Sequence, residues 1–120
     1  MQIGGGQQRG QRQAGLAPAP TDRLRGTYYR WLFFAAGPTE AATTNKSLGV
    51  VPSEERRRMV GYGTLEEVFD ALELAVAGRQ YIVGDRFSAA DVYVGSHIGW
   101  GLQFGTFERR PAFERYVAGI

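Results

Sequence analysis

The sequence contains no cysteine and only one histidine, His97. Without cysteine the chain cannot form disulfide bridges, thiolate nucleophiles or zinc-thiolate sites, and the cytoplasm is the expected compartment. A single histidine would need further ligands to hold a metal and a positioned nucleophile to act as a general base, and the sequence indicates neither. We therefore expect no catalytic residue and no metal site, and we interpret His97 as a packed or surface side chain.

Long apolar runs and an excess of charge are missing as well. The longest apolar stretch, residues 92–107, contains polar residues and several glycines and is too short and too polar to cross a bilayer. The segment after Met1 is rich in Gln, Gly and Arg and has no apolar run behind it, so we do not expect it to be a secretory signal peptide. The formal net charge is +2, and both surplus charges, Arg9 and Arg12, lie in the first thirteen residues. We expect neither a membrane nor a nucleic acid as partner.

The rest of the composition is that of a globular domain. Hydrophobic residues make up 43% and charged residues 22% of the 120 residues, which suits one domain with a modest core. Residues 1–17 are of low complexity and end where an Ala-Pro repeat begins, so we expect a disordered head and linker there. Residues 18–120 are expected to form the folded domain.

Apolar residues recur at helical spacing in this domain, and no segment alternates over the length that a sheet needs. The first predicted helix covers residues 21–36, bends or breaks at Gly37-Pro38 and continues to about Leu48. A short last helix is expected to begin at Pro111, because proline suits the first position of a helix. The elements together predict an all-α helical bundle.

A long amphipathic helix is predicted after the first helix, from Ser53 to its end at Gly78. Ser53 and the two glutamates that follow it are typical of a helix start. Gly61 and Gly63 interrupt the pattern at a cost of about 1 kcal/mol each relative to alanine, which indicates a bend or the close approach of another backbone. The apolar positions of this helix are Met59, Tyr62, Leu65, Phe69, Leu72 and Val76.

The sharpest local pattern precedes a glycine-rich apolar segment that reaches to about Phe104. Ser88 can accept a hydrogen bond from the amide of Asp91, and the Asp91 carboxylate can accept one from the amide of Ser88, which together make a capping box. Phe87 can pack on Val92 as a hydrophobic staple. Because the helix that follows is apolar on all sides, we expect it to be the central helix against which the others pack.

With these elements in place, the chain resembles the C-terminal domain of cytosolic glutathione S-transferases of the bacterial type. Residues 28–38 look like the first helix of that domain, residues 81–91 like the loop that enters its buried helix, and residues 110–113 like the start of the next helix. The similarity runs in order over roughly residues 15 to 120. It implies a bundle that packs beside a thioredoxin-like domain, which this sequence lacks, and a domain truncated at its C-terminal end.

In that family the thioredoxin-like domain holds the co-substrate glutathione and supplies the residue that stabilises its thiolate. The resemblance therefore implies a domain that contributes the hydrophobic electrophile-binding half of the site, binds no cofactor alone and is inactive alone. The implied partners are a thioredoxin-like domain, either in trans or in a missing part of the chain, a second copy of the chain, and a small hydrophobic compound. Two alternatives stay open: a non-catalytic helical protein-interaction module and a non-functional fragment.

The candidate substrate-binding residues are aromatic. Trp100 matches a tryptophan that some bacterial members of the family place in the electrophile pocket, although a tryptophan in an apolar helix suits a core equally well. Tyr28, Trp31 and Phe34 are weaker candidates for that pocket or for a dimer interface. Packing in the core is the favoured role for these three.

Overall fold

The computed structural model describes residues 16–120, which form helices, turns and loops without a β-strand, so the predicted all-α class is confirmed. None of the helices in that range is long and apolar enough to cross a membrane. The expected disordered head falls largely on residues 1–15, which lie outside the described part. In chain order the elements are α2 (Arg25–Phe34), the π-helical turn η1 (Ala35–Thr39), α3 (Glu40–Ser47), the short 3-10 turn η2 (Arg57–Met59), α4 (Leu65–Val76), α5 (Ala89–Phe104) and α6 (Pro111–Gly119).

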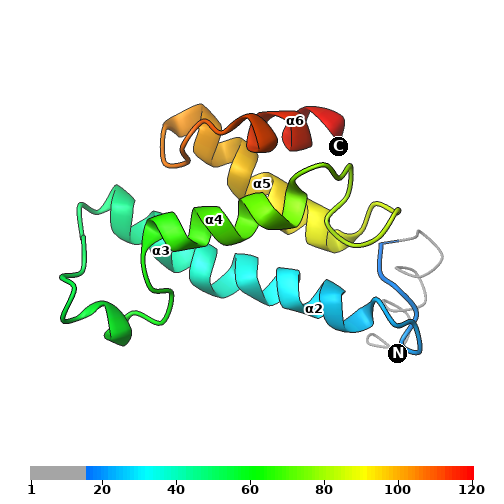
Figure 1. Ribbon diagram of the computed structural model, residues 1–120, viewed down its shortest axis with the longest axis horizontal. Coiled ribbons are helices and arrows are strands. Elements are labelled where there is room, and N and C mark those ends of the chain that lie inside the picture. The colour runs from blue at the N-terminus through cyan, green and yellow to red at the C-terminus, as the bar shows by residue number, and fades with distance from the viewer. Residues whose placement is uncertain (1–15) are drawn as a thin grey trace, which may run out of the picture.

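The expected bend or break at Gly37-Pro38 takes the form of a π-helical turn. Pro38 has no N–H to donate, and in an α-helix its ring would collide with the carbonyl of Phe34. The wider turn over Ala35–Thr39 accommodates the proline, and the chain continues directly into α3. Figure 1 shows α2 and α3 following one another along the long axis of the molecule.

The long amphipathic helix predicted between α3 and α6 is only half present, and its predicted start is wrong. Residues 53–59 form turns and one short 3-10 turn, and the helix itself begins after Thr64. Gly61 and Gly63 have φ angles of 76° and 78°, which no continuous right-handed helix permits. The Thr64 hydroxyl accepts a hydrogen bond from the Glu67 amide at 3.1 Å and caps α4.

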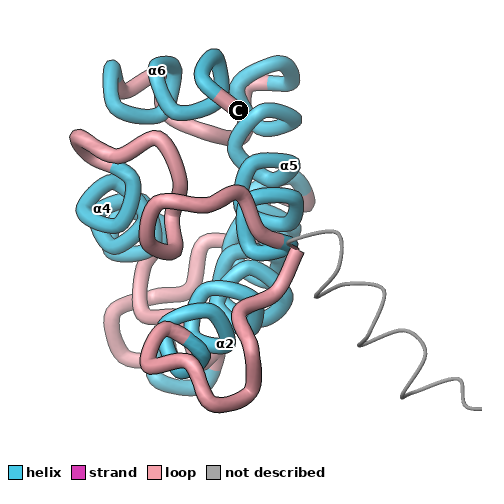
Figure 2. Tube along the Cα trace, turned by 90° about the vertical axis from the view of Figure 1, so that its right-hand side faces the viewer, coloured by secondary structure: helices cyan, strands magenta, loops and turns pink. Residues whose placement is uncertain are grey.

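One hydrophobic core joins the helices. In Figure 2, α4 and α5 lie between α2 and α6. Helix α5 contacts α2, η1 and α6, which gives it the central position that the sequence predicts. The fully or almost fully buried apolar side chains of the helices are Tyr28, Trp31, Ala35, Ala42, Val68, Phe69, Leu72, Val76, Ala90, Val94, Ile98, Ala112, Phe113 and Tyr116.

The start of α5 is organised around the fully buried carboxylate of Asp91. Its oxygens accept hydrogen bonds from the Ser88 amide at 3.1 Å, the Ile82 amide at 2.9 Å and the Tyr116 hydroxyl at 2.6 Å. Burial, and secondly this bond to Asp91, raise the pKa of Tyr116. Asp91 therefore ties the cap of α5 to the preceding loop and to α6.

The other half of the predicted capping box is less complete. The Ser88 side chain lies toward the Asp91 amide as a capping box requires, but its buried hydroxyl oxygen has no hydrogen-bond partner of good geometry among the described residues. Phe87 and Val92, the predicted staple, remain 37% and 45% exposed, and the Phe87 ring lies edge-on to Tyr81 with 6.1 Å between ring centroids. The Asp91 carboxylate is thus the better-supported part of the cap.

The glycines of α5 allow close packing on one side of that helix. A Cβ atom at Gly101 would overlap the Phe107 ring, and one at Gly95 would overlap the Ile120 side chain. The predicted tight packing around α5 is therefore observed on this side. The opposite side of α5 is exposed, which differs from the expectation of a helix buried all round.

Candidate functional site

The exposed side of α5 carries a stripe of ring-bearing side chains, from Tyr93 to Phe104. They recur at steps of four, three and four residues along the helix, so they share one helical face. Trp100 is 68%, Phe104 59% and Tyr93 55% exposed. The rings of Trp100 and Phe104 contact each other, with 4.7 Å between centroids and 53° between planes. We call Tyr93, His97, Trp100 and Phe104 the outer stripe.

A hollow of about 380 Å³ lies beside the outer stripe, between α5, α3 and the loop that follows α5. This volume is within the range of roughly 300–1,000 Å³ that small-molecule sites occupy. Aromatic rings form much of its wall, and hydroxyl groups and an imidazole provide the polar contacts. The lining residues are Thr43, Tyr93, Ser96, His97, Trp100, Gly101 and Thr106.

The imidazole of His97 is the titratable group of this hollow that burial perturbs. Desolvation lowers the pKa of His97 below its ordinary 6.5, and the nearby negative charge of Glu40 opposes the shift only in part. At neutral pH the ring is therefore uncharged, with one nitrogen that donates and one that accepts a hydrogen bond. Ser96 and His97 are consecutive in the helix and do not face each other, so they do not form a nucleophile and base pair. The hollow has aromatic walls against which a ring could stack, with hydroxyl groups and a neutral imidazole as hydrogen-bonding groups.

The other aromatic candidates lie elsewhere. Tyr28 and Trp31 are 4% and 7% exposed and belong to the hydrophobic core, the role that the sequence favours for them. Phe34 is half-buried and packs edge-on against Trp31, with 5.3 Å between centroids. The structure thus brings none of the three into the hollow beside Trp100, and Trp100 alone of the four candidates lines it.

Sequence reasoning missed most of the outer stripe. Tyr93 and Phe104 lie seven residues before and four residues after Trp100, a spacing that places all three on one helical face. This regular spacing is the signal that could have identified them. The sequence could not separate that face from the buried one, because both faces of α5 are apolar.

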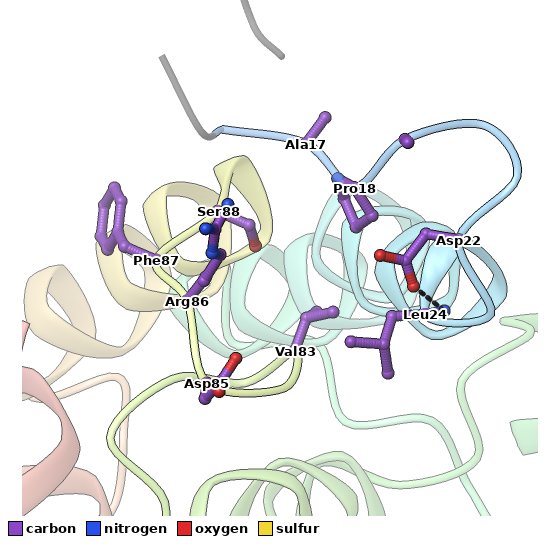
Figure 3. Close-up of a pocket in the computed structure, with 10 residues that line it drawn as sticks. Ala17, Pro18, Asp22, Leu24, Val83, Asp85, Arg86, Phe87 and Ser88 are labelled. Carbon is purple, nitrogen blue, oxygen red and sulfur yellow. Dashed lines mark hydrogen bonds between the residues drawn. The ribbon is translucent and has the colours of Figure 1, made fainter. Parts of the chain in front are cut away.

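A second hollow, of about 360 Å³, lies where the chain enters α2 and the loop before α5 begins. Figure 3 shows Asp22 and Asp85 at this hollow together with Arg86 and Phe87, and the Asp22 carboxylate accepts a hydrogen bond from the Leu24 amide at 2.8 Å. Because side chains of both charges line this hollow, it has no clear preference for a charged ligand.

The densest charged cluster of the described residues is structural. The Arg110 guanidinium, 15% exposed, pairs with Asp70 at 2.8 Å and with Glu73 and Glu108 at 3.1 Å each. These bonds join α4, the loop after α5 and the start of α6. Within residues 16–120 no group of three or more His, Cys, Asp or Glu side chains has the arrangement of a metal site.

The fold defines a class, an all-α helical domain, and in this chain α5 carries an exposed aromatic face beside a hollow. The family model of the glutathione S-transferase C-terminal domain matches residues 29–119, which is most of the chain. The chain therefore belongs to the glutathione S-transferase C-terminal domain family, as its resemblance to that family implies. No curated protein and no solved structure matches the chain.

Proposed function

We propose that this domain supplies the hydrophobic wall of the electrophile-binding site of a glutathione S-transferase. The observation that carries the proposal is the outer stripe: three large aromatic side chains, each more than half exposed, beside a hollow of about 380 Å³. Contiguous exposed apolar surface of this kind is typical of a binding site. The neutral imidazole of His97 adds a hydrogen-bonding group that can meet a polar substituent on an aromatic compound.

The proposal assigns activation of glutathione to residues outside this domain. A thiolate forms at neutral pH only where a hydrogen-bond donor or a positive field is held at the sulfur. The hollow beside Trp100 has no cationic lining residue. It does have hydroxyl donors, but the family holds glutathione, and the residue that stabilises its thiolate, in the thioredoxin-like domain. We therefore propose a thioredoxin-like domain as the partner that binds glutathione, whether it belongs to the same polypeptide or to another.

A second copy of the chain is the other proposed partner. Tyr29 and Phe33 project from α2, 39% and 67% exposed, and their rings are stacked with 5.9 Å between centroids. Pairing of this patch with its copy would remove both rings from water. Sedimentation of the purified chain should show self-association that Phe33→Glu weakens, and a monomeric wild-type chain at all concentrations would contradict this pairing.

We propose that this domain binds the electrophile and that another domain activates glutathione, and a conjugation assay tests this directly. The purified 120-residue chain is mixed with glutathione and 1-chloro-2,4-dinitrobenzene, and we expect no rate above that of the uncatalysed reaction. An apolar wall can bring the aromatic compound close to the thiol, but it does not lower the thiol pKa. Saturable, glutathione-dependent turnover by this chain alone that Trp100→Ala reduces would refute the proposal.

A further inference from the structure

A separate pocket of about 250 Å³ lies between the end of α3, the loop that follows it and the start of α4. In Figure 1 this loop projects from the body of the molecule, at the end of the long axis away from the N-terminus. The pocket and the hollow beside Trp100 use different sides of α3, since Ala42 and Lys46 line the pocket and Thr43 lines the hollow. The pocket is therefore independent of the site proposed for the electrophile.

Backbone and side-chain bonds hold the walls of this pocket in place. The Val50 amide donates to the Asn45 carbonyl at 2.8 Å, which keeps the departing loop against α3. The Asn45 side chain donates to the Tyr62 hydroxyl at 3.1 Å and so holds the returning end of the loop as well. Gly63, with a φ of 78°, then turns the chain into α4.

The lining of the pocket is almost entirely apolar, with a single cation at its edge. The chain contains only one lysine, Lys46, and that residue is the cation. Lys46 forms no ion pair with any of residues 16–120. Its ammonium group is thus available to a ligand. The full lining consists of Ala42, Lys46, Val50, Val51, Pro52, Tyr62, Gly63, Thr64 and Leu65.

The charges beside the pocket are mixed, with a positive balance. Arg57, Arg58 and Glu67 line a shallow hollow that shares Gly63 with the pocket, and the Glu67 carboxylate lies against Gly63. The pairing of Arg57 with Glu54 is long, at 3.9 Å, and largely exposed, so it neutralises little of the arginine charge.

We propose that this loop pocket binds a small apolar carboxylate, with its ring or hydrocarbon body between Ala42, Tyr62 and Leu65. The carboxylate of the ligand pairs with the Lys46 ammonium at the edge. The volume of about 250 Å³ lies below the roughly 300–1,000 Å³ of sites for drug-sized ligands, so the ligand has the size of one or two rings. A neutral analogue of the same shape keeps the apolar contacts and loses the ion pair.

The first experiment uses the fact that Lys46 is the sole lysine. The purified chain is treated with an amine-acylating reagent, and acylation of Lys46 is followed by peptide mass spectrometry with the N-terminal amine as internal reference. We expect 1-naphthoate to slow acylation of Lys46 in a saturable way and to leave the N-terminal amine unaffected. The amide of the same acid, 1-naphthamide, should protect Lys46 much less.

The second experiment locates the site and tests the charge. In a titration followed by NMR, 1-naphthoate should shift the backbone amides of Lys46, Val51 and Leu65 and leave that of Trp100 unchanged. Lys46→Met keeps most of the side-chain length, and it should weaken naphthoate binding roughly three- to fivefold, the effect of losing one exposed ion pair. Arg115→Met removes the same charge from an exposed position of α6 and should leave binding unchanged.

The outcomes decide the proposal without reference to conjugation activity. Selective protection of Lys46, shifts confined to the pocket and the loss caused by Lys46→Met would support it. Equal binding of the acid and the amide, an unchanged affinity in Lys46→Met, or shifts centred on Trp100 would overturn it. Failure of the conjugation prediction would leave these results untouched, because they are measured without glutathione.

Discussion

Both faces of α5 are largely apolar, aliphatic on the inner side and aromatic on the outer side, but they lie in opposite surroundings. On the inner face, Ala90, Val94 and Ile98 are at most 1% exposed, and the one buried carboxylate, that of Asp91, has three hydrogen-bond donors. On the outer face, the aromatic rings of the outer stripe lie in water beside a hollow. The difference shows that burial is confined to one side of α5, so substitutions should separate the stability that the inner face provides from the ligand binding proposed for the outer face.

The largest effect is expected from Asp91→Ala on the inner face. A helix cap alone accounts for about 1–2 kcal/mol. The substitution also leaves the Ile82 amide and the Tyr116 hydroxyl without their acceptor in the core, which raises the expected loss of unfolding free energy to about 3–5 kcal/mol. Urea unfolding measures this loss, and Asp85→Ala on the exposed loop is the matched control, expected within about 0.5 kcal/mol of wild type. A loss below 1 kcal/mol would show that Asp91 does not organise the inner face.

A smaller loss is expected where α4 and α6 meet. Arg110→Met keeps the packing of the side chain and removes three ion pairs, whose carboxylates are 62%, 39% and 61% exposed. Because water screens these carboxylates, we expect a loss of about 1–2 kcal/mol that becomes smaller at high salt. Arg109→Met breaks one exposed pair with Glu114 at 3.4 Å and one exposed hydrogen bond to the Leu102 carbonyl at 3.1 Å, and it should cost less than about 0.5 kcal/mol. Equal losses in both variants would argue against a cooperative cluster at Arg110.

The pH dependence of stability should show whether His97, on the outer face of α5, is partly buried. Burial lowers the pKa of His97 in the folded chain, so the unfolded chain takes up this proton at a higher pH than the folded chain does. The contribution of His97 to stability is therefore complete above about pH 6.5, the ordinary histidine pKa, and decreases as the pH falls below it. Urea unfolding at pH 7.5 and 5.5 should show a smaller decrease for His97→Gln than for wild type. Identical decreases would place His97 in water and outside the wall of the hollow.

The helix ends were predictable from sequence where a single residue type determines them. Pro111 begins α6 as expected, and the start of α5 follows Ser88. The start of α4 was not predictable from the periodicity of its apolar residues, because Met59 and Tyr62 extend that periodicity backwards through residues that are not helical. The left-handed conformations at Gly61 and Gly63 interrupt the helix, and the sequence pattern alone does not distinguish them from tolerated helical glycines.

The candidate site was predictable only in part, for a related reason. The sequence singled out Trp100, but it could not decide between core and pocket, since the face of an apolar helix that becomes buried depends on the helices packed against it. The structure places Ala112 and Tyr116 of α6 in the core and leaves Trp100 exposed. The chain also contains Trp31, equally aromatic and at helical spacing, which is buried. Residue type alone therefore could not separate the two tryptophans.

On α5, the smaller change in stability is expected at the outer stripe. Trp100 is 68% exposed, so Trp100→Ala removes only part of its surface from contact with the domain and should lower the unfolding free energy by about 1 kcal/mol, well below the loss expected for Asp91→Ala. Urea unfolding of Trp100→Ala and of Asp91→Ala under the same conditions compares the two losses of unfolding free energy directly. A loss of 2 kcal/mol or more in Trp100→Ala would assign Trp100 to the core and remove the distinction between the two faces.

The most direct test of an electrophile wall on the outer face is the fluorescence of single-tryptophan variants. Trp31→Phe leaves Trp100 as the only tryptophan, and Trp100→Phe leaves only the buried Trp31. Each variant is titrated with 1-chloro-2,4-dinitrobenzene without glutathione. We predict saturable quenching of Trp100 in the first variant and no saturable quenching of Trp31 in the second. Linear, collisional quenching of Trp100, or the same saturable quenching of both tryptophans, would contradict the assignment of the outer stripe as the ligand wall.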